Sequence, residues 1–394
     1  MLIAININCN ADKLADLAKV KAAVEQLKKE NPKVKDWSRL KVQNSNDEVE
    51  LTLFTIKGLE DLSALKDTPL QHLSLQATTI KDISSLKGLK LKHLNLMRSK
   101  VSDISVLKGM PLDQLYLDET SITDLSPLQG MPLTYLTLRS SKVVTINTLK
   151  GLPLDHLDLS ETNITDISPL STVSSLKTLK LIGCKISNLS ALKNSSLHSL
   201  QLYGCPVSDL SPLKGTPITS LGLEDTKVID ISPLKGMKLN YLELEGTAVT
   251  NISALSGVPL VRLSLPDTVT NVDVLRSIKT LKFINGHPPQ NYWKLQSLIK
   301  KLGKEKALDV EKKLVVCYAN MKQIIMACDF FYAGGNNGNY PPDLKTLNDK
   351  QILNDSKVYV CPSHTDTSNP KATFTAAKSD YVYLGKGVNT NNEN

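Results

Sequence analysis

Aromatic residues are scarce in this sequence, and long apolar segments are missing. Phe, Trp and Tyr together account for 5% of 394 residues, although hydrophobic residues reach 41%. A core with so few aromatic rings fits a chain packed mainly through leucine better than a globular enzyme. No run approaches the roughly 18 apolar residues that a spanning helix needs, so we expect no membrane span in this chain.

Recognisable catalytic and targeting motifs are also missing. No G-x-S-x-G, H-E-x-x-H, Gly-rich phosphate loop or spaced Ser, His and Asp set occurs in a supportive context. The start, MLIAININCN, has a short apolar stretch and no positive charge, so we do not expect it to act as a signal peptide. We therefore predict a protein that is not an enzyme and uses no cofactor or metal.

What the sequence has in abundance is a leucine repeat. Residues 111–131 read PLDQLYLDETSITDLSPLQGM, and residues 132–152 read PLTYLTLRSSKVVTINTLKGL. The middle leucine of L-x-x-L-x-L recurs every 21 residues, except for one step of 22. These leucines are Leu73, Leu94, Leu115, Leu136, Leu157, Leu179, Leu200, Leu221, Leu242 and Leu263. Such a period marks a solenoid, in which each unit buries its apolar side against its neighbours.

One unit shows how the chain should run. The L-x-L step of Leu115 and Leu117 has the period of two expected of a short strand, so Tyr116 and Asp118 should face the open side of a sheet. Ser126 and Pro127 then suit the start of a helical turn, with Ser126 as N-cap. Few residues separate them from the next glycine, so we predict a single 3₁₀ turn and a gently curved arc.

A small polar residue follows each strand. This position reads Thr78, Ser99, Thr120, Ser141, Thr162, Cys184, Cys205, Thr226, Thr247 and Thr268. Buried polar groups must be paired, so we expect a ladder of donors to backbone carbonyls of neighbouring turns. The two cysteines of the ladder are expected to be buried structural thiols without a bridge between them, because ladder side chains lie parallel.

The unit PLxxLxLxxTxVxDISPLKGM resembles the bacterial leucine-rich repeat with an SPL convex turn. The resemblance covers residues 48–285 and implies a curved α/β solenoid, with a parallel sheet on its concave face and short 3₁₀ turns on its convex face. It also implies a binding role, most often through the concave sheet, and no catalytic residues. We therefore expect a noncatalytic scaffold that recognises a protein or polysaccharide partner.

The candidate binding residues are those expected on the concave sheet face. They are Tyr116, Asp118, Tyr135, Arg139, His156, Asp158, Tyr203 and Tyr241, with Glu224, Glu243 and Glu245 beside the last two. Tyr and Arg favour interfaces because they combine apolar area with hydrogen bonding. A polar face also serves solubility, and a hydrolase using these carboxylates is one alternative. His72 and His93, on adjacent strands with no carboxylate expected beside them, are interpreted as surface histidines.

The net charge of +8 arises largely from one convex position of the repeat. That position is occupied by Lys66, Lys87, Lys108, Lys150, Lys193, Lys214 and Lys235. Acidic residues are interspersed among these lysines throughout the chain. We therefore interpret the lysines as a solvated stripe and predict no nucleic-acid partner.

The ends of the repeat array need covering. Residues 1–47 should form a helical cap, with a helix from Ala11 to Glu30 that ends at Asn31-Pro32. Its expected apolar stripe consists of Leu14, Leu17, Val20, Val24 and Leu27. Residues 286–312 should form a C-terminal cap or linker, helical from Tyr292.

Residues 313–394 differ from the repeats. They resemble the soluble half of bacterial prepilin-like and type II secretion pseudopilin proteins, a small α+β fold, here with a disordered tail. The matching residues are Cys317, Asn320, Lys322, Gln323, Ile324, Asn339, Tyr340, Pro341, Pro342, Cys361 and Pro362. A structural subunit of a secretion or pilus-like assembly is a second alternative, but the apolar helix that anchors such proteins is absent from this sequence and would have to be supplied by a longer gene product. Export to the periplasm or cell surface, which we favour over the cytoplasm, would allow a Cys317–Cys361 disulfide.

Overall fold

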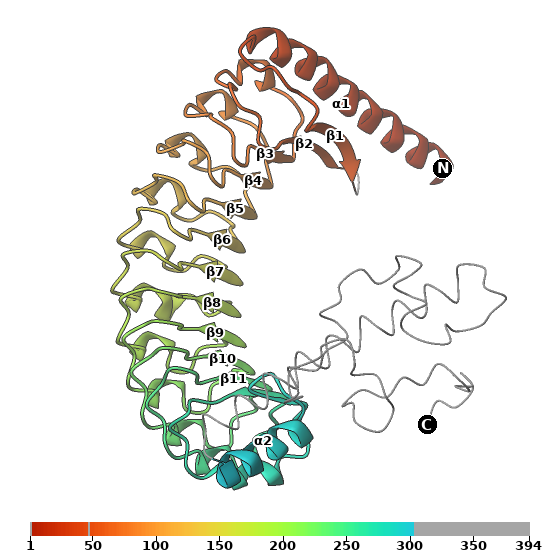
Figure 1. The fold of residues 1–394 in the computed structure, drawn as a ribbon. Coiled ribbons are helices and arrows are strands. Elements are labelled where there is room, and N and C mark those ends of the chain that lie inside the picture. Colours follow the sequence, from red (N-terminus) through yellow and green to blue (C-terminus); the bar gives the residue numbers. More distant parts are fainter. Residues whose placement is uncertain (1, 46–47, 303–394) are drawn as a thin grey trace, which may run out of the picture. The chain divides into compact units, whose positions relative to one another are not determined.

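The computed structural model of the protein describes residues 2–45 and 48–302. The chain divides into two compact units, Met1–Gly286 and His287–Asn394. The first unit contains helix α1 (Leu2–Glu30), a long sheet and a series of 3₁₀ turns (Figure 1). Helix α2 (Pro289–Leu302) lies in the second unit, and the predicted pseudopilin-like region falls outside the described residues.

A thirteen-stranded sheet lines the concave side of the first unit, with its strands in sequence order (Figure 1). β1 is antiparallel to β2, and the later strands pair in parallel. The strands are β1 (Leu40–Ser45), β2 (Glu48–Leu53), β3 (His72–Ser74), β4 (His93–Asn95), β5 (Gln114–Tyr116), β6 (Tyr135–Thr137), β7 (His156–Asp158), β8 (Thr178–Lys180), β9 (Ser199–Gln201), β10 (Ser220–Gly222), β11 (Tyr241–Glu243), β12 (Arg262–Ser264) and β13 (Phe283–Ile284).

The leucine period sets both the register and the core. Leu115 lies opposite Leu94 on one side and Leu136 on the other, as the 21-residue spacing predicts. All three side chains are fully buried. The solenoid expected from the sequence is therefore confirmed for the repeats.

A single 3₁₀ turn forms the convex side of each repeat, as predicted. The turns are η1 (Ser63–Leu65), η2 (Ser84–Leu86), η3 (Ser105–Leu107), η4 (Ser126–Leu128), η5 (Asn147–Leu149), η6 (Ser168–Thr172), η7 (Ser190–Leu192), η8 (Ser211–Leu213), η9 (Ser232–Leu234), η10 (Ser253–Leu255) and η11 (Val272–Ser277). η6 is two residues longer than η4, and it takes up the extra residue of the 22-residue step. Leu157 still pairs with Leu179, so the insertion leaves the sheet in register.

The prediction that Ser126 caps its turn was wrong. The N-cap residue is Leu125, which makes no side-chain capping bond. Asp124 serves instead, because its carboxylate accepts the backbone N–H of Ser126 at 2.8 Å and the hydroxyl at 2.7 Å. The same pair recurs at Asp82 and Ser84, Asp166 and Ser168, Asp209 and Ser211, and Asp230 and Ser232.

These aspartates should make the solenoid sensitive to acid. Hydrogen bonds from the serines lower the pKa of Asp124, Asp166 and Asp230. A depressed folded-state pKa contributes stability that is present above the ordinary aspartate value of about 3.9 and is lost as the pH falls through the folded value. We expect the melting temperature to fall as the pH drops below about 4.

Asparagine supplies a matched control for this effect. Asn188 already holds the N–H of Ser190 at 2.8 Å in another repeat, and its amide does not titrate in this range. The combined variant Asp124→Asn, Asp166→Asn and Asp230→Asn should therefore show a shallower loss of melting temperature below about pH 4. Identical profiles for the variant and the parent protein would contradict the role given to these carboxylates.

The predicted polar ladder is confirmed only in part, because most of its threonines bond within their own repeat. Thr120 donates its hydroxyl to the carbonyl of Leu117 at 2.6 Å, within its own repeat. The threonine hydroxyl sits close to the carbonyl three residues earlier, so it need not reach the neighbouring turn. Cys184 and Thr268 do reach it: Cys184 Sγ lies 3.0 Å from the carbonyl of Leu159, and the Thr268 hydroxyl donates to the carbonyl of Val249 at 2.6 Å.

The N-terminal cap is a helix and a hairpin rather than helix alone. α1 begins at Leu2, well before the expected start at Ala11, and β1 adds a strand that the sequence reading did not predict. Only the second half of α1 buries the expected stripe. Val20, Val24 and Leu27 are buried, Leu17 is partly exposed, and Leu14 is 64% exposed.

Asn31 fixes the end of α1 to the first repeat. Its amide nitrogen donates to the carbonyls of Leu27 and Asp61, at 2.9 and 2.8 Å. Its amide oxygen accepts the backbone N–H groups of Glu60 and Asp61, both at 2.9 Å. One buried side chain therefore joins the helix to the loop before η1. The division into 1–47, 48–285, 286–312 and 313–394 stays a prediction.

Candidate functional site

Three aromatic side chains form a contiguous row across the middle of the concave face. Tyr116 is the third residue of β5, and Tyr135 and His156 are the first residues of β6 and β7. The rings of Tyr116 and Tyr135 lie 5.1 Å apart and are tilted by 39°. The rings of Tyr135 and His156 are stacked, with centres 4.2 Å apart and planes nearly parallel at 5°. One face of the Tyr135 ring is therefore stacked on His156, and the tilted ring of Tyr116 lies beside it.

The row is held in place by its surroundings. Tyr116 donates its hydroxyl to Gln114 at 2.9 Å, and burial raises the pKa of this tyrosine. Burial, with Lys180 nearby, lowers the pKa of His156, so the imidazole is mostly uncharged near neutral pH. The row is thus largely uncharged near neutral pH and partly exposed.

Asp118 is not available to a ligand as a free carboxylate. It is 6% exposed and accepts the hydroxyl of Thr137 at 2.5 Å and the backbone N–H of Arg139 at 2.7 Å. Burial raises the pKa of this carboxyl group. The side chain of Asp118 thus links the end of β5 to β6 and the segment after it. Its role in the sheet is structural.

The other central candidates are also engaged within the protein. Arg139 forms an ion pair with Glu161 at 2.5 Å, beyond the end of its strand. Asp158 accepts the backbone N–H of Ser160 at 2.9 Å and lies 3.8 Å from Lys180. The structure therefore brings Tyr116, Tyr135 and His156 together, while the charged side chains of the predicted cluster are paired locally.

The interpretation of His72 and His93 needs one correction. Their rings are 4.2 Å apart at 89°, and carboxylates do stand beside them. His72 Nε2 lies 2.5 Å from Glu48, and His93 Nε2 lies 3.8 Å from Asp113. Glu48 is the first residue of β2 and Asp113 precedes β5, so neither occupies the sheet position that His72 and His93 share. Within the described residues, no group of three or more His, Cys, Asp and Glu side chains could hold a metal ion.

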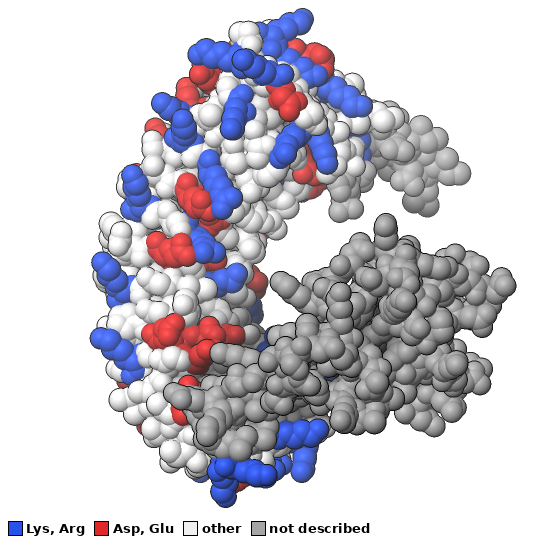
Figure 2. All heavy atoms as spheres, in the orientation of Figure 1, with Lys and Arg blue, Asp and Glu red and all other residues white. Residues whose placement is uncertain are grey.

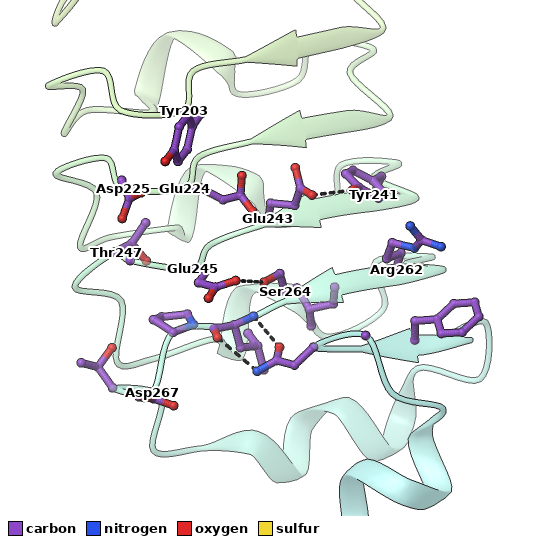
Figure 3. Close-up of a pocket in the computed structure, with 18 residues that line it drawn as sticks. Tyr203, Glu224, Asp225, Tyr241, Glu243, Glu245, Thr247, Arg262, Ser264 and Asp267 are labelled. Atoms are coloured by element: carbon purple, nitrogen blue, oxygen red, sulfur yellow. Dashed lines mark hydrogen bonds between the residues drawn. The ribbon is translucent and has the colours of Figure 1, made fainter. Parts of the chain in front are cut away.

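A second region of interest is a hollow of about 1090 Å³ over the later repeats. Figure 3 shows its carboxylates, Glu224, Glu243 and Glu245, grouped in the middle, and Arg262 lying apart from them near Tyr241. The guanidinium of Arg262 lies 5.8 Å from the ring centre of Tyr241 and 5.1 Å from that of Phe283. The sequence reading did not include Arg262 or Phe283. Their position at the start of a strand, in register with Tyr241, was the signal that could have found them.

Tyr203 and Tyr241, the remaining predicted residues, both line this hollow. Tyr203 is 43% exposed, and its hydrogen bond with Asp225 raises its pKa. Tyr241 donates its hydroxyl to Glu243. The predicted binding face is thus split into the central row and this hollow.

The buried thiols carry no sign of reactivity. Cys184 and Cys205 are each 1% exposed and unbridged, as expected for the ladder. Burial raises the pKa of Cys184, and it raises that of Cys205 to about 12. Because the thiolate is the reactive form, both groups are structural. Cys317 and Cys361 lie outside the described residues.

The convex face carries the predicted lysine stripe. Figure 2 shows basic side chains spaced along this edge of the repeats, with acidic groups between them. Each lysine follows a 3₁₀ turn, as Lys108 follows η3 and Lys214 follows η8, and its side chain is exposed. Neither described helix has the combination of length and apolar content that crossing a membrane requires.

Comparisons with known proteins agree with this fold. A family model described as leucine-rich repeats (2 copies) matches residues 154–194. Curated proteins give no significant match to the sequence. Among solved structures, internalin InlF of Listeria monocytogenes is similar over 60% of this chain and 72% of its own, with 24% identity and a TM-score of 0.53. This similarity shows the leucine-rich repeat fold.

Two further solved structures are similar at lower TM-scores. Internalin C2 of Listeria monocytogenes gives 29% identity and a TM-score of 0.37, over 47% of this chain and 76% of that one. The ectodomain of the Arabidopsis thaliana receptor kinase GASSHO1/SCHENGEN3, in complex with CASPARIAN STRIP INTEGRITY FACTOR 2, gives 16% identity and a TM-score of 0.48. That match covers 64% of this chain and 37% of the ectodomain.

Proposed function

We propose that this leucine-rich repeat protein is a noncatalytic binding protein that recognises a protein partner through its concave sheet. The observation that carries the proposal is the contiguous row of Tyr116, Tyr135 and His156 on three adjacent strands. Rigid aromatic groups bury large areas at little entropic cost, which is why they dominate binding energy at interfaces.

The same row favours a protein over a polysaccharide partner. A sugar ring binds an aromatic side chain through its flat face, and one face of Tyr135 is already stacked on His156. Tyr116 and Tyr135 remain partly exposed, and their rings and hydroxyl groups suit the apolar and hydrogen-bonding side chains of a protein surface. A polysaccharide therefore ranks below a protein or peptide in this proposal.

A hydrolytic role has less support from the carboxylates of the central face. Asp118 is buried and engaged with Thr137 and Arg139, and Asp158 is bonded to Ser160. General acid–base catalysis needs carboxyl groups positioned toward a substrate. The role in a secretion or pilus-like assembly depends on residues 313–394, outside the described part of the chain.

Export to the periplasm or cell surface completes the proposal. It accords with the resemblance of residues 313–394 to secretion-associated proteins, and a Cys317–Cys361 disulfide would accompany it. The protein's partner should then be found in an envelope extract rather than in a cytoplasmic extract.

The test combines a concave variant with a convex control. The combined replacement of Tyr116, Tyr135 and His156 by alanine should weaken capture of the partner from envelope extract at least about thirtyfold, since hot-spot aromatics contribute about 2 kcal/mol or more each. The partner is identified by mass spectrometry, and its affinity for the purified full chain is then measured by titration calorimetry. Circular dichroism should show that the variant remains folded, because the three side chains lie on the open face.

Replacement of the convex residues Lys108, Lys214 and Lys235 by alanine is the matched control. It changes three exposed side chains and should leave affinity within about twofold, because these lysines lie on the other side of the solenoid. A partner lost with the convex variant and retained with the concave variant would place binding on the convex side. Capture from cytoplasmic extract alone would contradict the proposed compartment.

A further inference from the structure

The hollow over the later repeats combines negative charge with exposed aromatic surface. Glu243 is the last residue of β11, and Glu224 and Glu245 follow β10 and β11 by two residues each. Their carboxylates lie together in the middle of the hollow (Figure 3). Among the described residues, Glu243 and Glu245 accept hydrogen bonds only from the neutral hydroxyls of Tyr241 and Ser264.

No cation of the described chain neutralises this group. Arg262 is the basic residue that lines the hollow, and its guanidinium stacks over Tyr241 and Phe283 instead. Burial and the neighbouring carboxylates Glu243 and Glu245 raise the pKa of Glu224. Like charges held this close repel one another, so a positive group placed between them would be stabilised.

Aromatic surface stands beside the carboxylates. Tyr203 is 43% exposed, whereas the residue before it, Leu202, is fully buried in the core. An exposed aromatic ring attracts ammonium and guanidinium groups through its face, and carboxylates beside it add charge–charge attraction. The hollow therefore attracts a cationic group in two ways, through the tyrosine ring and through the carboxylates.

Two glycines leave room for this arrangement. A side chain at Gly246 would place its Cβ 1.9 Å from the Asp225 carboxylate, so only glycine lets that carboxylate lie where it does. A Cβ at Gly222 would come within 1.9 Å of Gln201 Oε1. Gly246 also has a φ of +70°, which side-chain-bearing residues rarely adopt.

We propose that this hollow binds a lysine or arginine side chain carried by a basic peptide segment of a protein partner. The inference rests on the proposed binding through the concave face and names the chemistry of the partner there. The occupant follows from charge complementarity: unpaired carboxylates and an exposed tyrosine meet a cation with an apolar stem. A divalent metal is a poorer fit, because no three acidic or histidine side chains of the described residues could coordinate one.

The experiment measures binding of a defined peptide to the full chain. The probe is a fluorescein-labelled decapeptide of alternating basic (Lys, Arg) and small (Gly, Ser) residues, followed by fluorescence anisotropy at about 0.15 M salt. Glutamine replaces Glu224, Glu243 and Glu245 together, which keeps shape and removes charge. We expect affinity for the peptide to fall about tenfold or more. The melting temperature of this variant should not decrease, because its carboxylates no longer repel one another.

A matched control changes the net charge by the same amount elsewhere. Asp16→Asn, Glu25→Gln and Glu60→Gln remove three acidic groups outside the hollow, each of which forms an ion pair at the surface. This variant should bind the peptide within about twofold of the parent protein, since distant surface charges are screened. Tyr203→Leu should weaken binding a further few-fold by removing the ring that attracts the cation.

Three outcomes would overturn the inference. One is equal loss of affinity in both triple variants, which would mean general attraction to a negative surface. Another is unchanged affinity in the glutamine variant. The third is calcium binding that displaces the peptide and disappears in the glutamine variant, which would make the hollow a metal site. If the hollow variant keeps the natural partner while the Tyr116, Tyr135 and His156 variant loses it, the proposed function stands and this inference alone falls.

Discussion

Replacing Leu115 by aspartate should disrupt several neighbouring repeats and lower the unfolding free energy by at least about 4 kcal/mol. Leu115 is fully buried between Leu94 and Leu136 on the adjoining strands. Truncating a buried leucine already costs about 2–5 kcal/mol, and the aspartate adds a charge with no partner. Because each repeat is stabilised by its neighbours, the damage should extend beyond β5.

Urea denaturation followed by circular dichroism measures the loss, and hydrogen exchange resolves which strands open. Exchange should increase in β4, β5 and β6 together. The control is Lys108→Asp, which introduces the same side chain at an exposed convex position and should change stability by no more than about 0.5 kcal/mol. A Leu115→Asp protein with an unchanged denaturation midpoint would refute the assigned register.

The second large effect is expected at Asn31, where replacement by alanine should release the N-terminal cap. The substitution removes four hydrogen bonds and leaves the N–H groups of Glu60 and Asp61 without their acceptor. Each unsatisfied buried group costs about 1–3 kcal/mol, so the local opening free energy should fall by about 3 kcal/mol. α1 should then become open to proteolysis before the repeats unfold.

Asn31→Asp separates the contributions of the two halves of the amide. The carboxylate still accepts from Glu60 and Asp61 but no longer donates to Leu27 and Asp61. Its effect on limited proteolysis and on hydrogen exchange in α1 should therefore lie between those of asparagine and alanine. If Asn31→Ala protects α1 as well as the parent protein does, another contact holds the cap.

The sequence was most informative where a residue type repeats. The spacing of Leu94, Leu115 and Leu136 predicts the strands, their parallel order and their register, and all three are observed. The convex turns followed from the short interval between serine and glycine. Because the same residues recur in each repeat, the same strand and turn form in each. A correct prediction for one repeat therefore holds for the others.

The sequence was least informative where pairing depends on a single contact. β1 has no repeat to identify it and exists because it pairs with β2 in an antiparallel hairpin. Asp118 and Arg139 have the residue types of a binding site, yet Thr137 and Glu161 engage them. The partner of a charged side chain depends on its rotamer and on its neighbours in three dimensions. The residue type alone does not predict that partner.

The structure divides the predicted residues between a central row and a hollow, and their role in binding stays a prediction. Placement on the concave sheet follows from the period of two along each strand. Grouping into an aromatic row and a hollow depends on offsets between strands, such as Tyr116 in the third position beside Tyr135 in the first. The residues themselves remain predictions until the variants above are measured.

The longer turn η6 has a consequence for how such proteins change over evolution. An extra residue entered the convex side between Leu157 and Leu179, while the strands on both sides kept their pairing. Insertions and deletions can therefore accumulate behind the sheet without moving the groups in front of it. The two faces are free to diverge at different rates, and the convex turns are the natural places to graft a tag or an added loop.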